Sequence, residues 1–352
     1  MRPSAKAAGD EKIASYTFPT SAELLVIEQE FTARLEENRF VFSFFPKNTV
    51  DAHLVKWEQK DNYLGLAQVR GLNGEPMRVK RIGHKQYLMA PGVYGEYVVL
   101  DEQELTTRRQ IGTFADPISL DDLVVEAQEQ LLQRELDRIE KIIWDLLVAG
   151  TFSVAGPMGT TLHSDSYSNQ TFTATTPWAT VATATPIKDL RSIQLLSRGK
   201  GVNFGSQSQA IMNRTTANSL FANTNASDLG GKKSNLGGSI TGPDDVNRIL
   251  TQEDLPQIVI WDQGYADDTG TFQLFIPNAK VVVVGQRPGN QNVGEYRFTR
   301  NVNNEAFAPG PYTRVIDTLV ENGDVPRKMI VHRGHNGGAV IFYPGAIVSA
   351  SV

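Results

Sequence analysis

One uninterrupted helical pattern, from Ser119 to Gly150, constrains the fold of this chain more than any other stretch. Its apolar residues recur at spacings of three and four, which places them on one face of an α-helix. Ser119 can cap the first turn, and Gly150 can take the left-handed conformation that ends a helix. At 1.5 Å per residue the helix is roughly 45 Å long, longer than a small compact domain is wide. The pattern therefore predicts either the core helix of a large α+β domain or a strut in an elongated subunit that its neighbours complete.

The composition indicates a globular protein and excludes several other classes. The chain has 352 residues, of which 40% are hydrophobic and 21% charged, enough for two or three domains. It has no cysteine, so disulfides and thiolate metal sites are impossible. Because no apolar run approaches the ~20 residues of a membrane span, and the start lacks the apolar core of a secretion signal, we expect a soluble protein. The formal net charge of -5 argues against tight binding of a nucleic-acid backbone.

The segments before the long helix have little core of their own. Residues 1–19 are polar and rich in alanine, which predicts an arm without an independent fold. A short amphipathic helix is expected over Thr20–Asn38, and the four phenylalanines between it and Pro46 require burial. Strand patterns then run from 52 to 109 with a hairpin turn at Asn73-Gly74. These patterns predict a long, half-exposed β-hairpin that is not stable alone in water.

Alternating α/β patterns after the long helix predict a second domain. Residues 151–185 are rich in Ser and Thr and predict a connecting loop with one weak hairpin. The expected helices are Ile187–Arg198, Thr215–Asn223 and Asp245–Leu255, and the expected strands are Gln209–Met212, Gln257–Trp261, Thr271–Ile276, Lys280–Val284, Tyr312–Val320, Arg327–His332 and Ala339–Val348. The last three strands can return to pack beside the long helix.

No stretch carries the signature of a catalytic, cofactor-binding or metal site. The glycine-rich range 228–245 contains two lysines but lacks the spacing of a phosphate loop, so a mobile loop is expected. His332 and His335 lie three apart beside glycines, with no glutamate nearby to complete a metal site. The three aspartates of 262–268 are typical of a turn and lack the order of a calcium loop. We therefore expect no catalytic residue, no cofactor, no metal ligand and no enzymatic activity.

Three stretches, taken in their order along the chain, resemble the lambda-type major capsid proteins of tailed phages. The end of that family's long helix is similar to LQRELDRIEKIIWDLLVAGTF, and a hairpin leading into a valine-rich strand is similar to VIWDQGYADDTGTFQLFIPNAKVVVV. The family's closing strand is similar to GGAVIFYPGAIVSASV. This family, also called major capsid protein E, has the Hong Kong 97 capsid fold. The similarity covers about residues 20–352, and its specificity lies in the order of the stretches.

The resemblance implies an α+β fold of the Hong Kong 97 type in five parts. These parts are an N-terminal arm and short helix (1–50), an extended E-loop β-hairpin (51–110), a P-domain (111–185) with the spine helix 119–150, an A-domain (186–315), and C-terminal strands that return to the P-domain (316–352). It also implies a structural subunit that self-assembles into hexamers and pentamers of an icosahedral phage head. Such a head encloses double-stranded DNA without binding it specifically.

The resemblance further implies where the protein acts and with which partners. The chain is expected in the virion capsid, after assembly in the host cytoplasm, with no membrane contact. Its expected partners are copies of itself, a portal, in some heads a decoration protein, and a scaffold that is either a separate protein or a segment already removed. Some relatives form covalent crosslinks from an E-loop lysine. Lys80 and Lys85 lie in that segment, but no asparagine partner can be assigned, so packing without covalent links is expected.

Two alternatives stay open from the sequence. The first is an encapsulin-like nanocompartment shell of the same fold, which would enclose enzyme cargo in place of DNA. The second, from another class, is a soluble α/β enzyme that uses the second domain. Particles filled with DNA would exclude the first alternative, and a well-formed polar pocket in a monomer would favour the second.

Overall fold

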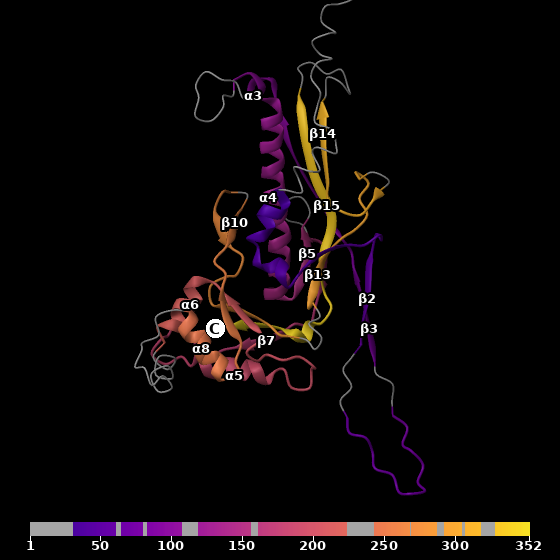
Figure 1. Cartoon of the computed structure of the whole chain (residues 1–352), viewed down its shortest axis with the longest axis vertical. Coiled ribbons are helices and arrows are strands. Elements are labelled where there is room, and N and C mark those ends of the chain that lie inside the picture. Colours follow the sequence, from indigo (N-terminus) through magenta and orange to yellow (C-terminus); the bar gives the residue numbers. More distant parts are fainter. Residues whose placement is uncertain are drawn as a thin grey trace, which may run out of the picture. The chain divides into compact units, whose positions relative to one another are not determined.

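The computed structural model describes residues 31–60, 65–79, 83–107, 119–155, 161–223, 243–267, 269–286, 292–304, 307–317 and 328–352. The chain divides into two compact units. The first contains Met1–Arg39, Tyr94–Leu136 and Pro311–His335, and the second contains Phe40–Val93, Asp137–Gly310 and Asn336–Val352. Figure 1 labels the elements, among them the long helix α4, which contributes residues to both units.

Helix α4 spans Leu120–Ala149, as the sequence predicts, and both of its ends have the expected caps. Ser119 Oγ accepts the N–H of Asp122 at 3.1 Å, which satisfies one free amide of the first turn. At the other end Gly150 has a φ of 71° and donates its N–H to the carbonyl of Leu146 at 2.9 Å. The left-handed conformation is accessible to glycine at little cost, so the helix ends there.

In the first unit the start of α4 packs against a sheet. Strand β14 (Tyr312–Asp317) pairs antiparallel with the first half of β15 (Met329–Ile341), and β4 (Gly92–Leu100) also pairs with β15. The helix supplies Leu123, Val124, Ala127 and Leu131 to a core that β15 completes with Met329 and Val331. A short helix, α3 (Glu102–Thr107), follows β4 where the sequence analysis expects strand; this prediction is wrong.

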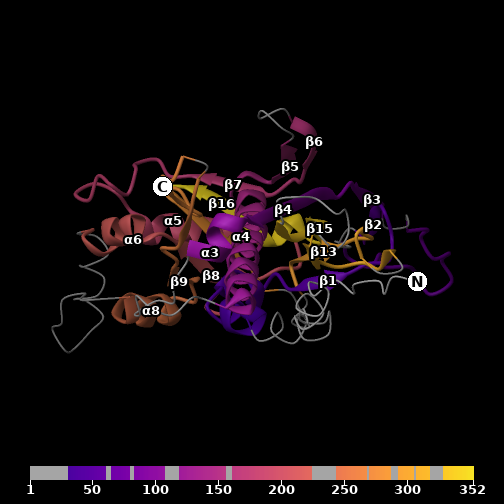
Figure 2. The same cartoon turned by 90° about the horizontal axis from the view of Figure 1, so that it is seen from above.

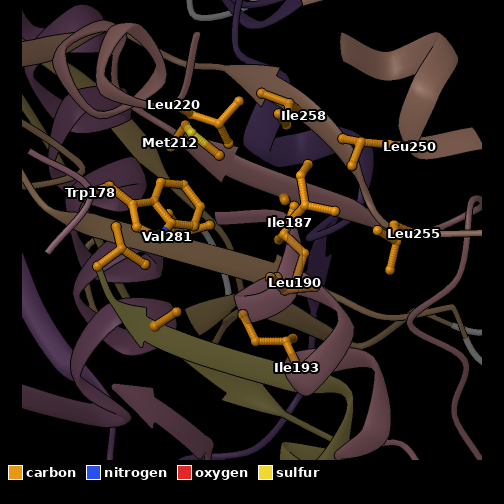
Figure 3. Close-up of a cluster of buried hydrophobic side chains, with 14 of the residues drawn as sticks. Trp178, Ile187, Leu190, Ile193, Met212, Leu220, Leu250, Leu255, Ile258 and Val281 are labelled. Carbon is orange, nitrogen blue, oxygen red and sulfur yellow. The ribbon is translucent and has the colours of Figure 1, made fainter. Parts of the chain in front are cut away.

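The second unit contains a five-stranded sheet with helices around it. The strand order is β7 (Gln170–Thr173), β16 (Ile347–Ser351), β12 (Lys280–Val284), β8 (Gln209–Met212) and β9 (Gln257–Ile260). Helices α5 (Pro186–Leu195), α6 (Arg214–Phe221) and α8 (Pro243–Gln252) gather around it (Figure 2). Ile187, Leu190 and Ile193, one face of α5, meet Val281 of the central strand in a buried core (Figure 3).

Smaller strand pairs complete the second unit. A hairpin joins β2 (Val55–Lys60) to β3 (His84–Met89), a second joins β5 (Thr151–Ala155) to β6 (Thr161–Ser166), and a third joins β10 (Gly264–Ala266) to β11 (Phe272–Leu274). Strand β13 (Gly294–Phe298) pairs with β1 (Lys47–Thr49) and with the second half of β15. Single turns of 3-10 helix lie at Phe40–Ser43 and Pro344–Ala346.

Two further sequence predictions are corrected by the sheet topology. The range 151–185 is more than a connecting loop, because its strand β7 pairs in parallel with β16 at the edge of the five-stranded sheet. The strand expected over Ala339–Val348 is two strands, since β15 ends at Ile341 and β16 begins at Ile347. Pro344 cannot donate a ladder hydrogen bond, so the chain turns between them.

The expected N-terminal segments can be compared with the structure only in part. Residues 31–37 are helical, in agreement with the end of the helix expected over Thr20–Asn38, and the arm of residues 1–19 lies outside the described residues. Among the phenylalanines before Pro46, Phe45 is fully buried and the other three are half-buried.

The outer edge of β9 is closed by a side chain of α8. Asn247 Nδ2 donates to the carbonyl of Ile258 at 3.0 Å, and Asn247 Oδ1 accepts the N–H of Ile258 at 2.7 Å. The amide thus bonds the strand as a neighbouring strand would. Because a free edge is a template for pairing with another chain, Asn247 limits sheet-to-sheet association.

We expect Asn247→Ala to lower the free energy of unfolding by about 1–3 kcal/mol, since it removes two partly buried hydrogen bonds. Urea unfolding of the unassembled subunit measures this loss. Asn218→Ala, at an exposed position of α6, is the matched control and should change little. Equal unfolding curves for both variants would contradict the role of Asn247.

Candidate assembly surfaces

The base of the β2–β3 hairpin is anchored by aromatic stacking. Val55 and Met89 face each other across the first register pair and are buried. Trp57 stacks on Tyr87 with ring centroids 5.4 Å apart and on Tyr167 with centroids 6.1 Å apart. Stacked aromatic pairs contribute beyond their buried area, so the base of the hairpin is firmly held.

The tip of this hairpin, residues 65–79, is an extended loop without ladder pairing (Figure 1). Five large apolar side chains in it are between 61% and 101% exposed: Leu66, Val69, Leu72, Met77 and Val79. The turn is centred on Leu72-Asn73, one residue before the predicted Asn73-Gly74, because the N–H of Gly74 donates to the carbonyl of Gly71 at 3.0 Å. This hairpin tip is therefore an apolar surface with no core behind it.

A second exposed apolar surface lies in the excursion between β13 and β14, residues 299–310. Hydrogen bonds close this excursion on itself: Gly310 N–H donates to the carbonyl of Thr299, and Asn304 Nδ2 donates to the carbonyls of Ala308 and Gly310, both at 3.1 Å. Its described part nevertheless leaves Val302 75% and Phe307 59% exposed.

The backbone of Phe307 is strained. Its φ is 56°, in the left-handed region that bulky residues rarely occupy. Such strain persists where the surroundings impose it, and it concentrates at functional positions. The excursion therefore holds an apolar ring in water at a cost to the isolated subunit.

A buried charge cluster connects α4 to β15 inside the first unit. Arg333 Nε donates to Glu135 Oε2, and His335 Nδ1 lies 2.6 Å from Glu135 Oε1. Arg333 Nη1 also donates to Thr313 Oγ1 at 2.7 Å. Burial raises the pKa of Glu135, but the charge of Arg333 and the contact with His335 outweigh burial and hold that pKa at about 2.

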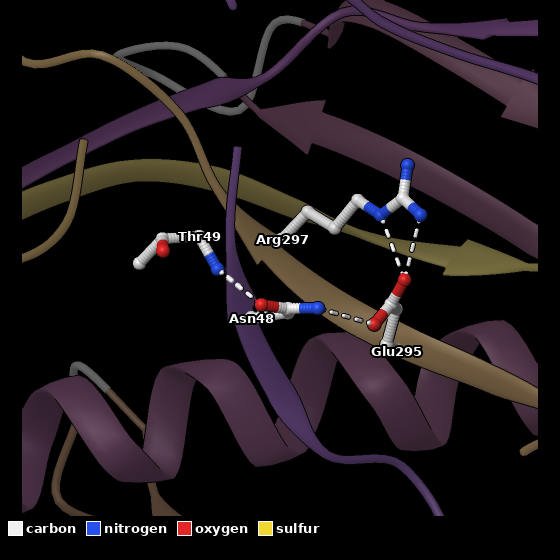
Figure 4. Close-up of polar contacts among 4 residues, drawn as sticks. All are labelled: Asn48, Thr49, Glu295 and Arg297. Atoms are coloured by element: carbon white, nitrogen blue, oxygen red, sulfur yellow. Dashed lines mark hydrogen bonds and ion pairs between the residues drawn. The ribbon is translucent and has the colours of Figure 1, made fainter. Parts of the chain in front are cut away.

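Two other buried carboxylates organise the second unit. Glu140 Oε1 of α4 accepts the indole N–H groups of Trp144 and Trp261, each at 3.1 Å, which ties the helix to the end of β9. Glu295 of β13 accepts from Arg297 Nη2 at 2.6 Å and from Asn48 Nδ2 at 3.1 Å (Figure 4). These arrangements fix tertiary structure and bring no nucleophile beside a base.

The structure explains the histidines and aspartates that the sequence analysis weighed as ligands. Side chains alternate along a strand, so His332 and His335 point to opposite faces of β15. His332 Nε2 lies 3.0 Å from the hydroxyl of Tyr312. Asp267 Oδ1 accepts from the N–H groups of Thr269 and Thr271 and from the Thr269 hydroxyl, which is turn chemistry.

Within the described residues, no group of three or more His, Cys, Asp and Glu side chains could hold a metal ion. No helix in that part of the chain is long and apolar enough to cross a membrane. Asp268, Lys80 and most of the glycine-rich range 228–245 lie outside the described residues. Lys85 is exposed on β3.

Sequence reasoning finds the hairpin but misses the excursion and the Glu135 cluster. The excursion has one signal, the run NVNN at 301–304, because asparagine favours turns and left-handed backbone. The burial of Glu135 has no local signal in the sequence. Its partners lie about 200 residues away, and the packing of β15 against α4 brings them to Glu135.

Acidification should weaken the first unit through Glu135. A carboxylate with a lowered folded-state pKa stabilises above its unfolded value, 4.5, and this stabilisation is lost as pH falls toward about 2. The difference corresponds to a loss on the order of 3 kcal/mol. Urea unfolding at stepped pH should show this loss in the native chain and not in Glu135→Gln.

The matched control is Glu129→Gln, which removes the exposed partner of Arg34 on the same helix. At neutral pH Glu135→Gln should also destabilise by roughly 3–5 kcal/mol, because Arg333 loses its buried partner. A pH profile that Glu135→Gln leaves unchanged would overturn this assignment.

Comparisons with solved structures agree with the fold. A protein assigned as the capsid protein of a prophage in E. coli CFT073 is 14% identical, with a TM-score of 0.57 over 92% of this chain and 98% of that chain. A phage-related protein from Bordetella bronchiseptica RB50 is 10% identical, with a TM-score of 0.55 over 93% and 96%. The mature capsid of bacteriophage PhiM1 gives 9% identity and a TM-score of 0.51 over 89% and 87%.

A search of curated proteins finds no match. The family model of phage major capsid protein E matches residues 37–300, most of the chain. The resemblance that the sequence analysis draws from three short stretches is confirmed. The chain therefore belongs to the phage major capsid protein E family, has the Hong Kong 97-like capsid fold, and is a structural subunit of the virion shell.

Proposed function

We propose that this subunit forms hexamers and pentamers that close into an icosahedral phage head around double-stranded DNA. The observation that carries the proposal is the hairpin tip, residues 65–79, with its five exposed apolar side chains. A two-stranded ribbon is marginal in water unless something covers it. In this proposal a neighbouring subunit covers the tip.

The magnitudes favour many contacts of this kind over a single dimer contact. Full burial of one Leu, Val or Met side chain contributes about 1.5–3 kcal/mol, so five contribute on the order of 10 kcal/mol. Association costs an estimated 4–15 kcal/mol in lost freedom and side-chain ordering. One tip contact thus roughly balances this cost, whereas a closed ring in which every subunit both gives and receives a contact is stable.

The excursion at 299–310 supplies a second proposed contact. It exposes Val302 and Phe307; the N–H of Phe307 donates to the carbonyl of Asn304, and that of Asn304 donates to the carbonyl of Asn301, beside Val302. Because these bonds already fix the described part of the excursion, that part loses little conformational entropy when a neighbour packs against it.

We also propose the five-part organisation that the resemblance implies. Its parts are the arm and short helix (1–50), the E-loop hairpin (51–110), the P-domain (111–185), the A-domain (186–315) and the returning strands (316–352). The last strand, β16, pairs with β12 of the A-domain range, so the returning chain ends in that sheet.

The remaining partners follow from the same proposal. A scaffolding protein, a portal and a decoration protein are the proposed partners besides the subunit itself. The net charge of -5 supports a shell that encloses DNA without binding its phosphate backbone tightly. We propose no enzymatic role, which family membership supports.

The triple variant Leu66→Ser, Val69→Ser and Leu72→Ser should abolish shell formation and leave the fold intact. Each replaced side chain is at least 91% exposed, so the subunit loses no core packing. The lost contact energy, on the order of 5 kcal/mol, should raise the concentration needed for assembly at least about a hundredfold. Size-exclusion chromatography with negative-stain electron microscopy of the earliest fraction measures this change.

The control is the double variant Leu162→Ser and Leu195→Ser, which removes exposed apolar side chains from β6 and the end of α5. It should assemble like the native chain. Rings or closed shells from the triple variant at native concentration would contradict the proposed role of the hairpin tip.

Phe307→Gly should have opposite effects on the subunit and on the shell. Glycine adopts a φ of 56° without strain, so the free energy of unfolding should rise by up to ~1 kcal/mol. Loss of the exposed ring should at the same time weaken assembly. Phe307→Asn, which also tolerates this conformation, should weaken assembly similarly. If the Phe307→Gly subunit were less stable than the native chain and assembled normally, the proposed role of Phe307 in assembly would be wrong.

A further inference from the structure

The centre of the hairpin tip contains the pair Asn73-Gly74, and both residues are exposed. One hydrogen bond holds the turn, from Gly74 N–H to the carbonyl of Gly71 at 3.0 Å. Arg70 Nη1 also reaches the carbonyl of Gly74, at 3.3 Å. No strand ladder restrains residues 65–79, so this backbone can change conformation easily.

An asparagine followed by glycine can modify itself. The backbone nitrogen of the glycine attacks the side-chain carbonyl carbon of the asparagine, and the side-chain nitrogen leaves as ammonia. Water then opens the five-membered imide ring to give aspartate or isoaspartate. The reaction consumes one water, releases one ammonia, and needs no oxidant, cofactor or catalyst. It requires an unshielded backbone nitrogen, which glycine provides, and a backbone that can bend toward the side chain.

Two further Asn-Gly pairs occur in the chain: Asn322-Gly323, which lies outside the described residues, and Asn336-Gly337, where the structure prevents the reaction. That pair lies inside β15, with Gly337 opposite Phe298 of β13. Asn336 Nδ2 donates to the carbonyl of Arg300 at 2.8 Å, and the Asn336 carbonyl accepts the N–H of Thr299 at 2.8 Å. Both the side chain and the backbone are fixed, so the nitrogen cannot reach the side-chain carbon.

We propose that Asn73 is a site of spontaneous deamidation that limits how long an unassembled subunit stays competent for assembly. The product carries a carboxylate among Arg70, Glu75 and Arg78, and isoaspartate adds a methylene to the backbone of the tip. A second part of this inference rests on the proposed packing of the tip against a neighbouring subunit. In that packing, assembly covers Asn73 and stops the deamidation. Free subunits then deamidate and lose competence for assembly with time, whereas subunits in a shell do not.

The modification can be measured on the full chain with trypsin and mass spectrometry. Cleavage after Arg70 and Arg78 isolates Asn73 in the peptide of residues 71–78, and cleavage after Arg333 isolates Asn336 in residues 334–352. Free subunit is incubated at mildly alkaline pH and sampled over days. We expect deamidation at Asn73 to be at least about a hundredfold faster than at Asn336, because a core strand opens rarely.

Two variants separate the chemistry from the fold of the tip. Gly74→Ala keeps the amide but shields the attacking nitrogen; a Cβ there would lie 3.3 Å from Gly71 N, so the turn needs only a small adjustment. Asn73→Gln keeps an amide that would have to close a larger ring. Both should lose most of the modification. Asn73→Asp mimics one product and should assemble less well than Asn73→Gln.

Each half of the inference has its own contrary result. Absence of product in residues 71–78, or equal rates at Asn73 and Asn336, overturns the modification site and leaves the proposed packing untouched. Equal modification of Asn73 in free subunits and in purified shells overturns protection by assembly and counts against packing of the tip. Asn73→Asp subunits that assemble as well as Asn73→Gln subunits overturn the link to assembly competence.

Discussion

The apolar stripe of α4 is the constraint on which the rest of the structure depends. A stripe on a helix of 30 residues is too long for one small core, and the chain divides it between two. Leu123, Val124, Ala127 and Leu131 are buried in the first unit, whereas Ile139, Ile143, Leu146 and Leu147 are buried in the second. Each core must therefore be completed by distant parts of the chain: β15 supplies Met329 and Val331 to the first core, and in the second unit Ser349 Oγ of β16 donates to the carbonyl of Val148 of the helix.

Charges on the same helix select which strands can complete it. Glu135 is buried, and its charge is paired with Arg333 and contacted by His335, so a slip of β15 by one residue would leave a buried charge without these partners. Glu140 has a similar role in the second unit, where both indole donors must reach one carboxylate oxygen. Apolar packing draws the strands to the helix, and these carboxylates fix the register.

The part of this fold that can be predicted from sequence is the part governed by local rules. The caps of α4 and the boundaries of β8 and β12 follow from neighbouring residues, and the structure confirms them. Strand β7 is missed because QTFT has little apolar periodicity and pairs only where the final strand reaches it. Glu135 is missed because burial of a charge depends on partners far along the chain. The resemblance to the capsid family identifies the function without knowledge of β7 or Glu135, because it depends on the order of the segments along the chain.

The polar closure of sheet edges and the exposure of apolar loops belong to one physical scheme. Asn247 bonds both backbone groups of Ile258, and Asn48 Oδ1 accepts the N–H of Thr49 at 2.9 Å on the side of β1 that faces away from β13. Edge pairing is non-specific and can continue without limit, whereas apolar side chains on shaped loops fit only particular surfaces. A shell subunit needs strong association at a few places and none elsewhere. Side-chain bonds at the outer sides of β9 and β1, together with exposed apolar loops, meet that requirement in a single chain.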